Sequence, residues 1–154
     1  EGNDWLCVEN ASASLYGREG DDKLIGGEKD DYINGGEGDD WLWGGEGNDE
    51  LHASSGNDSL WGGEGDDIFY IYIGNSDLTK VFVDGGKGTD TIILWKGVSW
   101  GAINCESDTS TDKYPDKIKC DNTTVFFKNV HTVKTALKFG VWYHNEKTIW
   151  QKEE

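Results

Sequence analysis

Apolar residues recur at every ninth position through the first half of the chain, and glycine and acidic residues occupy many of the positions between them. The recurring apolar residues are Leu6, Leu15, Leu24, Ile33, Leu42, Leu51, Leu60 and Phe69. One inward side chain between two outward ones is typical of a short strand, because successive side chains of a strand point to opposite faces. Each such strand hides too little apolar surface to fold alone, so the pattern predicts strands that stack around one continuous core.

The complete unit is nine residues long and begins with glycine. Gly35–Trp43, Gly44–His52 and Gly62–Tyr70 read G-G-x-G-x-D-x-U-x, where U is apolar, and Ala53–Trp61 is a variant. Glycine at the first, second and fourth positions lets the backbone turn tightly with positive φ. Such a turn presents backbone carbonyls together with one carboxylate, and these are hard oxygen ligands for a metal cation.

This repeat resembles the repeats-in-toxin (RTX) family, whose nonapeptide forms a calcium-binding parallel β-helix. The resemblance covers residues 1–93. It implies a right-handed parallel β-roll in which two units make one coil and Ca²⁺ lies between successive turns, held by sixth-position aspartates and backbone carbonyls. The expected fold is therefore all-β, with an RTX calcium-binding β-roll over residues 1–93 and a small, mostly-β C-terminal cap over residues 94–154.

The family pattern places the sixth-position aspartates in two columns. The first column is Asp4, Asp22, Asp40 and Asp58, and the second is Asp31, Asp49 and Asp67, continued by Asp90 after an insertion. The glycines expected to shape the binding turns are Gly17, Gly35, Gly36, Gly38, Gly44, Gly45, Gly47, Gly62, Gly63 and Gly65. The three adjacent pairs of the first column and the two among Asp31, Asp49 and Asp67 predict about five Ca²⁺ ions or more. Asp77 and Asp84 are further candidate ligands, of a terminal ion.

Three departures from the pattern fall near the N-terminus. Ala13 stands where a sixth-position aspartate belongs, Arg18 replaces a second-position glycine, and Lys29 replaces a fourth-position glycine. We expect the calcium slots nearest the N-terminus to be the weakest for this reason.

The charge is concentrated in the repeats. The chain has 30 acidic and 14 basic residues, and residues 1–93 hold 22 of the acids but only 5 of the basic residues. Two carboxylates ~4.8 Å apart repel by roughly 3.5 kcal/mol at an effective dielectric of ~20. The summed repulsion of several such pairs without a cation would exceed the free energy of unfolding of a small domain. We therefore expect the repeats to fold on Ca²⁺ binding. The acidic balance argues against a nucleic-acid partner, and no apolar run is long enough to span a membrane.

Several tryptophans fall at outward positions of one sheet, and we take them as a candidate interface: Trp5, Trp41, Trp43 and Trp61. Three explanations are open: the C-terminal region covers them, copies of the chain assemble through them, or glycans stack on them. The chain also starts within a unit, and an open end of the roll would allow copies to join head to tail into a fibre.

The sequence of residues 94–154 predicts mainly strands and one short helix, over residues 130–139. Asn129 is the expected helix cap, and Gly140 is expected to end the helix. The segments Val141–Tyr143 and Thr148–Trp150 predict a closing hairpin.

The cysteines and sequons point to an extracellular protein. Cys105 and Cys120 predict a disulfide contributing about 3 kcal/mol, which leaves Cys7 either free or paired with another chain. The candidate N-glycosylation acceptors are Asn10, Asn57 and Asn122.

The sequence carries no convincing catalytic constellation. Gly97–Gly101 matches G-x-S-x-G in letters, but the strand, helix and α/β scaffold that this motif needs are not predicted around it. His52, His131 and His144 show no metal-binding spacing. We therefore predict a non-catalytic, extracellular calcium-binding module with a structural, adhesive or self-assembling role. Two alternatives are the C-terminal secretion and folding module of a larger secreted toxin or hydrolase, and a calcium-dependent glycan binder that uses the tryptophan face.

Overall fold

The strands alternate between two facing sheets as the chain advances. The computed structural model describes residues 1–154 except 75–78, 97–104, 109–115, 121–122, 140–141 and 152–154. Within the described residues, in spatial order, the first sheet holds β1 (Trp5–Cys7), β3 (Lys23–Ile25), β5 (Trp41–Glu46), β7 (Ser59–Glu64), β9 (Thr79–Lys87), β13 (Thr123–Lys128), β12 (Asp116–Cys120) and β11 (Cys105–Asp108). The second sheet holds β15 (Trp142–Gln151), β14 (Thr132–Phe139), β10 (Thr91–Lys96), β8 (Ile68–Tyr72), β6 (Glu50–Ala53), β4 (Tyr32–Glu37) and β2 (Ser14–Glu19).

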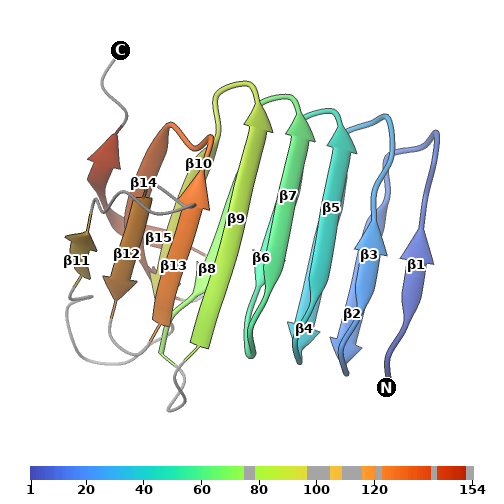
Figure 1. Ribbon diagram of the computed structural model, residues 1–154, viewed down its shortest axis with the longest axis horizontal. Helices are drawn as coiled ribbons and strands as arrows, with labels where there is room; N and C mark the ends of the chain where they lie inside the picture. The colour runs from blue at the N-terminus through green and yellow to red at the C-terminus, as the bar shows by residue number, and fades with distance from the viewer. Residues whose placement is uncertain (75–78, 97–104, 109–115, 121–122, 140–141, 152–154) are drawn as a thin grey trace.

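Two consecutive strands make one coil of a β-roll. β3 pairs with β5 in parallel, with Lys23 opposite Trp41, and β4 pairs in parallel with β6, with Tyr32 opposite Glu50. Each pairing joins residues two units apart in the chain. Figure 1 shows the coils stacked side by side from β1 to β9, with one sheet lying behind the other. The predicted all-β roll of parallel strands is confirmed.

The core between the two sheets is built from the eighth-position residues. The most deeply buried of them are Leu24, Ile33, Leu42, Leu51, Leu60 and Phe69, all 1% exposed or less. Burying one such side chain stabilises the fold by about 1.5–3 kcal/mol. Because each coil supplies only two of them, a coil depends on its neighbours for stability.

The described C-terminal strands continue both sheets. β13 pairs in parallel with β9, and β14 pairs in parallel with β10, which itself runs across residues 93 and 94. β12, β11 and β15 then pair antiparallel beyond them. Of the three explanations left open for the tryptophans, cover by the C-terminal region is not seen in the described residues. These strands extend the stack at its far end (Figure 1), and Trp43 remains 45% exposed.

The helix expected over residues 130–139 is also wrong. Thr132–Phe139 forms β14, between β10 and β15. The spacing of Val130, Val133 and Leu137 suits a helix, but the edge of β10 accepts a strand, and tertiary pairing overrides a weak local preference. Asn129, the expected helix cap, instead has a φ of 53° in the turn between β13 and β14.

The strands of the C-terminal hairpin differ from those that the sequence predicts. Trp142–Tyr143 and Thr148–Trp150 lie in the same strand, β15, which pairs antiparallel with β14. Both predicted arms are therefore one arm of the hairpin, and β14 is the other.

Candidate metal centre

The turns between the sheets bring the sixth-position aspartates into two columns. Each aspartate immediately precedes a strand, and the paired strands stack their turns one coil after another. First-column residues Asp4, Asp22, Asp40 and Asp58 precede β1, β3, β5 and β7, and second-column residues Asp31, Asp49, Asp67 and Asp90 precede β4, β6, β8 and β10. We call these eight residues the column aspartates.

One oxygen of a column aspartate bonds to the coil before it. The Oδ1 of Asp40 accepts the backbone N–H of Asp22, with an N···O distance of 2.9 Å. In the second column, the Oδ1 of Asp67 accepts the N–H of Asp49 at 2.8 Å. The Oδ1 of Asp90 accepts the N–H of Asp67 at 3.0 Å, so Asp90 continues this column across the insertion.

In six column aspartates the other carboxylate oxygen has no hydrogen-bond partner among the described residues, whereas in Asp31 it accepts the backbone N–H of Gly27 at 2.8 Å. The six buried Oδ2 atoms without a partner are those of Asp22, Asp40, Asp49, Asp58, Asp67 and Asp90. All six side chains are 2% exposed or less. Because an unpartnered buried carboxylate is costly, these oxygens call for a cation or a proton.

The first-position glycine leaves the space toward which this oxygen points. A Cβ built at Gly44 would collide with the Oδ2 of Asp49 and would lie 2.7 Å from the carbonyl oxygen of Gly62. The same pair of atoms, a carboxylate oxygen and a carbonyl oxygen from the next coil, faces Gly17, Gly26, Gly62 and Gly85. Gly44 does not have positive φ, whereas Gly45 and Gly47 have φ of 122° and 116°. The first glycine thus supplies room, and the second and fourth supply the turn.

These atoms suit a hard cation. Carboxylate and carbonyl oxygens converge on a space without side chains, and Ca²⁺ prefers such ligands. In the part of the chain that the structure describes, no three His, Cys, Asp or Glu side chains gather closely enough to hold a metal by themselves. Backbone carbonyls would therefore complete the coordination, which favours Ca²⁺ over the nitrogen- and sulfur-bound zinc.

Burial raises the pKa of five column aspartates, Asp40, Asp49, Asp58, Asp67 and Asp90. Desolvation raises the pKa of Asp58 to about 8, that of Asp49 and that of Asp67 to about 7, and that of Asp40 to about 6. The backbone hydrogen bond at Oδ1 opposes this shift, and neighbouring carboxylates add to it. The metal-free columns therefore hold protons at a pH where ordinary aspartates are charged.

Sequence reasoning missed a second ladder, at the fifth position of the turns. The Oδ1 of Asp21 accepts the backbone N–H of Asp39 at 2.9 Å, and the Oδ1 of Asp39 accepts that of Asn57 at 2.8 Å. On the other edge, the Oδ1 of Asp30 accepts the N–H of Asn48 at 2.8 Å. These bonds reach the following coil, whereas the sixth-position bonds reach the preceding one. An Asp or Asn at the fifth position of successive units is the sequence signal for this ladder.

The columns are poorer at their N-terminal ends. Asp4 is exposed, although its backbone N–H donates to the Oδ1 of Asp22 at 2.7 Å. Ala13 donates its N–H to the Oδ1 of Asp31 at 2.7 Å but has no carboxylate to offer. Arg18 holds a φ of 89° at a position where other units have glycine.

Asp84 lies outside both columns. It stands on β9 opposite Trp61, where its Oδ2 pairs with the Nζ of Lys128 at 2.6 Å. Its Oδ1 accepts a hydrogen bond from the Nδ2 of Asn129 at 2.8 Å. The structure therefore does not bring this candidate ligand to a calcium slot. Asp77 falls outside the described residues.

Two histidines have described side chains: His52 has its partners away from the columns, and His131 bonds to the backbone of a column aspartate. The Nε2 of His52 lies 2.6 Å from a carboxylate oxygen of Glu50, and its ring stacks on that of Tyr70. The Nδ1 of His131 accepts the backbone N–H of Asp90 at 3.2 Å. The G-x-S-x-G letters at Gly97–Gly101 lie outside the described residues.

The cysteines and sequons occupy separate places. Cys7 is exposed and free, whereas Cys105 stands directly opposite the buried Cys120 in the β11–β12 register. Asn10 and Asn57 are exposed, and the Nδ2 of Asn57 donates to Asp39. Asn122 lies outside the described residues. No helix in the described residues is long and apolar enough to cross a membrane.

Comparison with known proteins identifies the repeats. A family model described as the RTX calcium-binding nonapeptide repeat, which covers four copies of the unit, matches residues 16–51 and again residues 43–78. These matches include both columns from Asp22 to Asp67. No curated protein matches the chain.

Proposed function

We propose that Ca²⁺ fills both columns of the roll and drives its folding, because residues 16–78 match the RTX calcium-binding nonapeptide repeat. The observation that carries the proposal is the set of six buried Oδ2 atoms without partners. Five of these atoms lie against space kept free by a first-position glycine, those of Asp22, Asp40, Asp49, Asp67 and Asp90. The unit of Asp58 begins with Ala53 instead. Ca²⁺ between two coils would replace carboxylate repulsion by attraction, so binding and folding would be coupled.

We place the calcium ligands at the eight column aspartates and at carbonyl oxygens of the glycine turns. Because Asp90 is in register with Asp67, the second column has one more adjacent pair than the sequence count assumed. Three pairs in each column would hold about six Ca²⁺ ions. The slots next to Asp4 and Ala13 would be the weakest.

The proposed setting is extracellular. Extracellular calcium modules bind at roughly 10⁻⁴–10⁻³ M, which suits a protein that stays loaded outside the cell. Cys105 and Cys120 face each other on antiparallel strands, where paired Cα atoms lie within disulfide range, and we propose that they are linked. Residues 94–154 would then act as a disulfide-braced cap, and exposed Asn10 would be the most accessible sequon.

The proposed role is structural or adhesive and non-catalytic. The carboxylates whose pKa is raised by burial, such as those of Asp49 and Asp67, face a space suited to a cation. The exposed tryptophans of the first sheet would supply a contact surface, with Trp5 at 72% exposure.

Calcium titration of the chelator-treated chain tests the proposal. Calorimetry should count about six ions, with a parallel rise of the β-sheet signal in circular dichroism. Gly44→Ala places a methyl group against the Oδ2 of Asp49 and the carbonyl of Gly62, and should remove about one ion.

Ser59→Ala is the matched control, because Ser59 lies at an outward position of β7, and this variant should bind the full complement. Wild-type protein whose circular dichroism stays unchanged by Ca²⁺, or a Gly44→Ala variant that binds as many ions as wild type, would contradict the proposal.

A further inference from the structure

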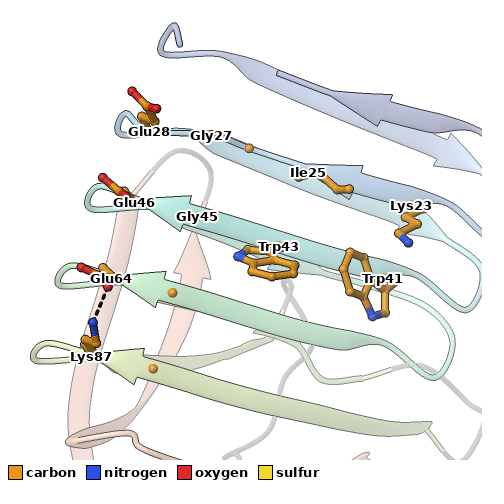
Figure 2. A pocket seen from close by; sticks show the side chains of 13 residues that line it. Lys23, Ile25, Gly27, Glu28, Trp41, Trp43, Gly45, Glu46, Glu64 and Lys87 are labelled. Carbon is orange, nitrogen blue, oxygen red and sulfur yellow. Dashed lines mark hydrogen bonds and ion pairs between the residues drawn. The ribbon is translucent and has the colours of Figure 1, made fainter. Parts of the chain in front are cut away.

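The outer face of the first sheet carries a groove of about 640 Å³ that crosses four successive coils. Its floor is glycine from β5, β7 and β9 and from the turn after β3: Gly27, Gly45, Gly63 and Gly86. The carboxylates of Glu28, Glu46 and Glu64 stand along one side, and Ile25, Trp41 and Trp43 stand along the other (Figure 2). We call it the acid–tryptophan groove.

The glutamates of this groove form an in-register row of like charges. Glu46 lies opposite Glu64 in the β5–β7 pairing, and Glu64 lies opposite Lys87 in the β7–β9 pairing. Like charges directly opposite each other on neighbouring strands destabilise a sheet. The row lies at the third position of each unit, away from the column aspartates, so it is not part of the proposed calcium slots. A cationic partner would relieve its repulsion.

Two lysines of the chain already show how the groove holds an ammonium group. The Nζ of Lys87 pairs with a carboxylate oxygen of Glu64 (Figure 2). The Nζ of Lys23 lies 4.4 Å from the ring centroid of Trp41 and 5.0 Å from that of Trp5. These are the charge-assisted bond and the cation–π contact by which proteins recognise ammonium ligands.

The remaining carboxylates of the row, those of Glu28 and Glu46, hold no cation in the described residues, and that of Glu28 accepts a hydrogen bond from the side-chain amide of Asn10 at 2.9 Å. Trp43 is 45% exposed. The row advances by one strand spacing, ~4.8 Å, per coil. The groove therefore offers carboxylates at regular intervals beside an indole face, along a floor without side chains.

We propose that the acid–tryptophan groove binds a linear chain of amino sugars. Sugar rings would stack on Trp43, and their ammonium groups would pair with Glu46 and Glu28. A pyranose ring has an apolar face suited to an indole, and a chain of such rings repeats its charge regularly, as the groove does. A peptide that adds a strand needs a free sheet edge, but this groove lies on a sheet face, whose backbone groups are bonded between strands.

The proposal rests on the calcium-folded roll proposed above, so its test monitors folding and binding on the same sample. The full chain in Ca²⁺ is titrated by calorimetry with a hexamer of glucosamine and, separately, with a hexamer of N-acetylglucosamine, which has the same ring chain without the charge. The glucosamine hexamer should bind at least about tenfold more tightly. Added salt should weaken that binding.

Variants locate the site. Glu46→Gln and Trp43→Ala should each weaken binding of the glucosamine hexamer by roughly tenfold, with circular dichroism unchanged. Glu37→Gln is the matched control, because Glu37 is an exposed third-position glutamate on the second sheet. It should bind as wild type does.

Three results on a calcium-folded roll would overturn this inference: no binding of the glucosamine hexamer, equal binding of the acetylated hexamer, or equally tight binding of a lysine hexapeptide. Equal losses in Glu37→Gln and Glu46→Gln would overturn it too. A roll that Ca²⁺ does not fold would instead refute the proposed function, and this inference with it.

Discussion

The coils before β10 and the strands after it share two sheets and one core, but they bury different groups in their turns. In the coils, every turn of the regular units buries a carboxylate, such as Asp40 or Asp49, each 2% exposed. In the described residues after Asp90, the buried side chains are apolar apart from Thr123. The Oγ1 of Thr123 accepts a hydrogen bond from that of Thr79 at 2.9 Å.

This difference separates two sources of stability within one architecture. The C-terminal strands rest on apolar contacts such as those of Val125 and Phe127, which need no ion. The coils add the same kind of core but carry columns of buried carboxylates, whose repulsion grows with every coil. β13 and β14 also offer paired edges to β9 and β10, so they would give the coils a template that is already ordered.

Removal of calcium should have the largest effect, because it should unfold the coils and leave the C-terminal strands more protected. In excess chelator above about pH 8, where Asp40 and Asp58 are charged, amides of β4 to β7 should exchange hydrogen almost as fast as in an unfolded peptide, because the unfilled columns repel. Amides of β13 and β14 should keep more of their protection. Hydrogen exchange read by mass spectrometry on peptides from each region measures this. If both regions lost their protection equally, or kept it equally, calcium would not distinguish them and this prediction would be wrong.

The next prediction concerns pH in calcium-free buffer. The folded-state pKa of Asp40 is raised to about 6 and that of Asp58 to about 8, from 3.8. A raised carboxyl pKa stabilises the fold below the unfolded value, and this stability is lost as pH rises through the folded value. The metal-free coils should therefore be most ordered near pH 4 and should lose order between about pH 6 and 8.

Circular dichroism across this range checks the pH prediction, with calcium-loaded protein as the control. Bound Ca²⁺ takes the place of the protons, so the loaded roll should change little between pH 6 and 8. A metal-free roll that gains order as pH rises would have the opposite sign and would contradict the raised pKa values.

The smallest prediction compares two residues with positive φ. Arg18 in the coils has a φ of 89°, and Asn129 in the C-terminal strands has a φ of 53°. Arginine seldom adopts this conformation, whereas asparagine does so readily. Arg18→Gly should therefore raise the stability of the calcium-loaded roll by about 1 kcal/mol.

Asn129→Gly serves as the counterpart to Arg18→Gly. It relieves little strain and removes the hydrogen bond to Asp84, so it should be neutral or slightly destabilising. Urea unfolding of both variants in Ca²⁺ measures the difference. A gain for Asn129→Gly as large as that for Arg18→Gly would show that φ alone does not explain the strain.

The sequence predicted the coils well because their information is local and repeated. The nine-residue spacing of Leu24, Ile33 and Leu42 determines which side chains enter the core, and it also sets the spacing of the aspartates. The Asp and Asn residues that form the fifth-position ladder recur just as regularly in the sequence. The ladder was missed because a bond from Asp21 to the backbone of Asp39 exists only after two coils are stacked.

The C-terminal region shows the limit of the same reasoning. Val130, Val133 and Leu137 suit a helix when read alone, and only the edge of β10 made the segment a strand. The sequence suggests Asp84 as a calcium ligand. In the structure, however, its carboxylate bonds to Lys128 and Asn129, which lie more than forty positions away in the chain.

By itself, then, the sequence determined the unit, the core row and the two columns of aspartates, since a repeat of fixed length imposes the same local geometry on every copy. The tertiary structure decided how the roll ends, which face stays open, and that glutamates and tryptophans border one groove. Those features depend on pairings such as that of β9 with β13, where Phe82 meets Phe126. No period in the chain encodes that pairing, and the free energy of completing a sheet edge selects it.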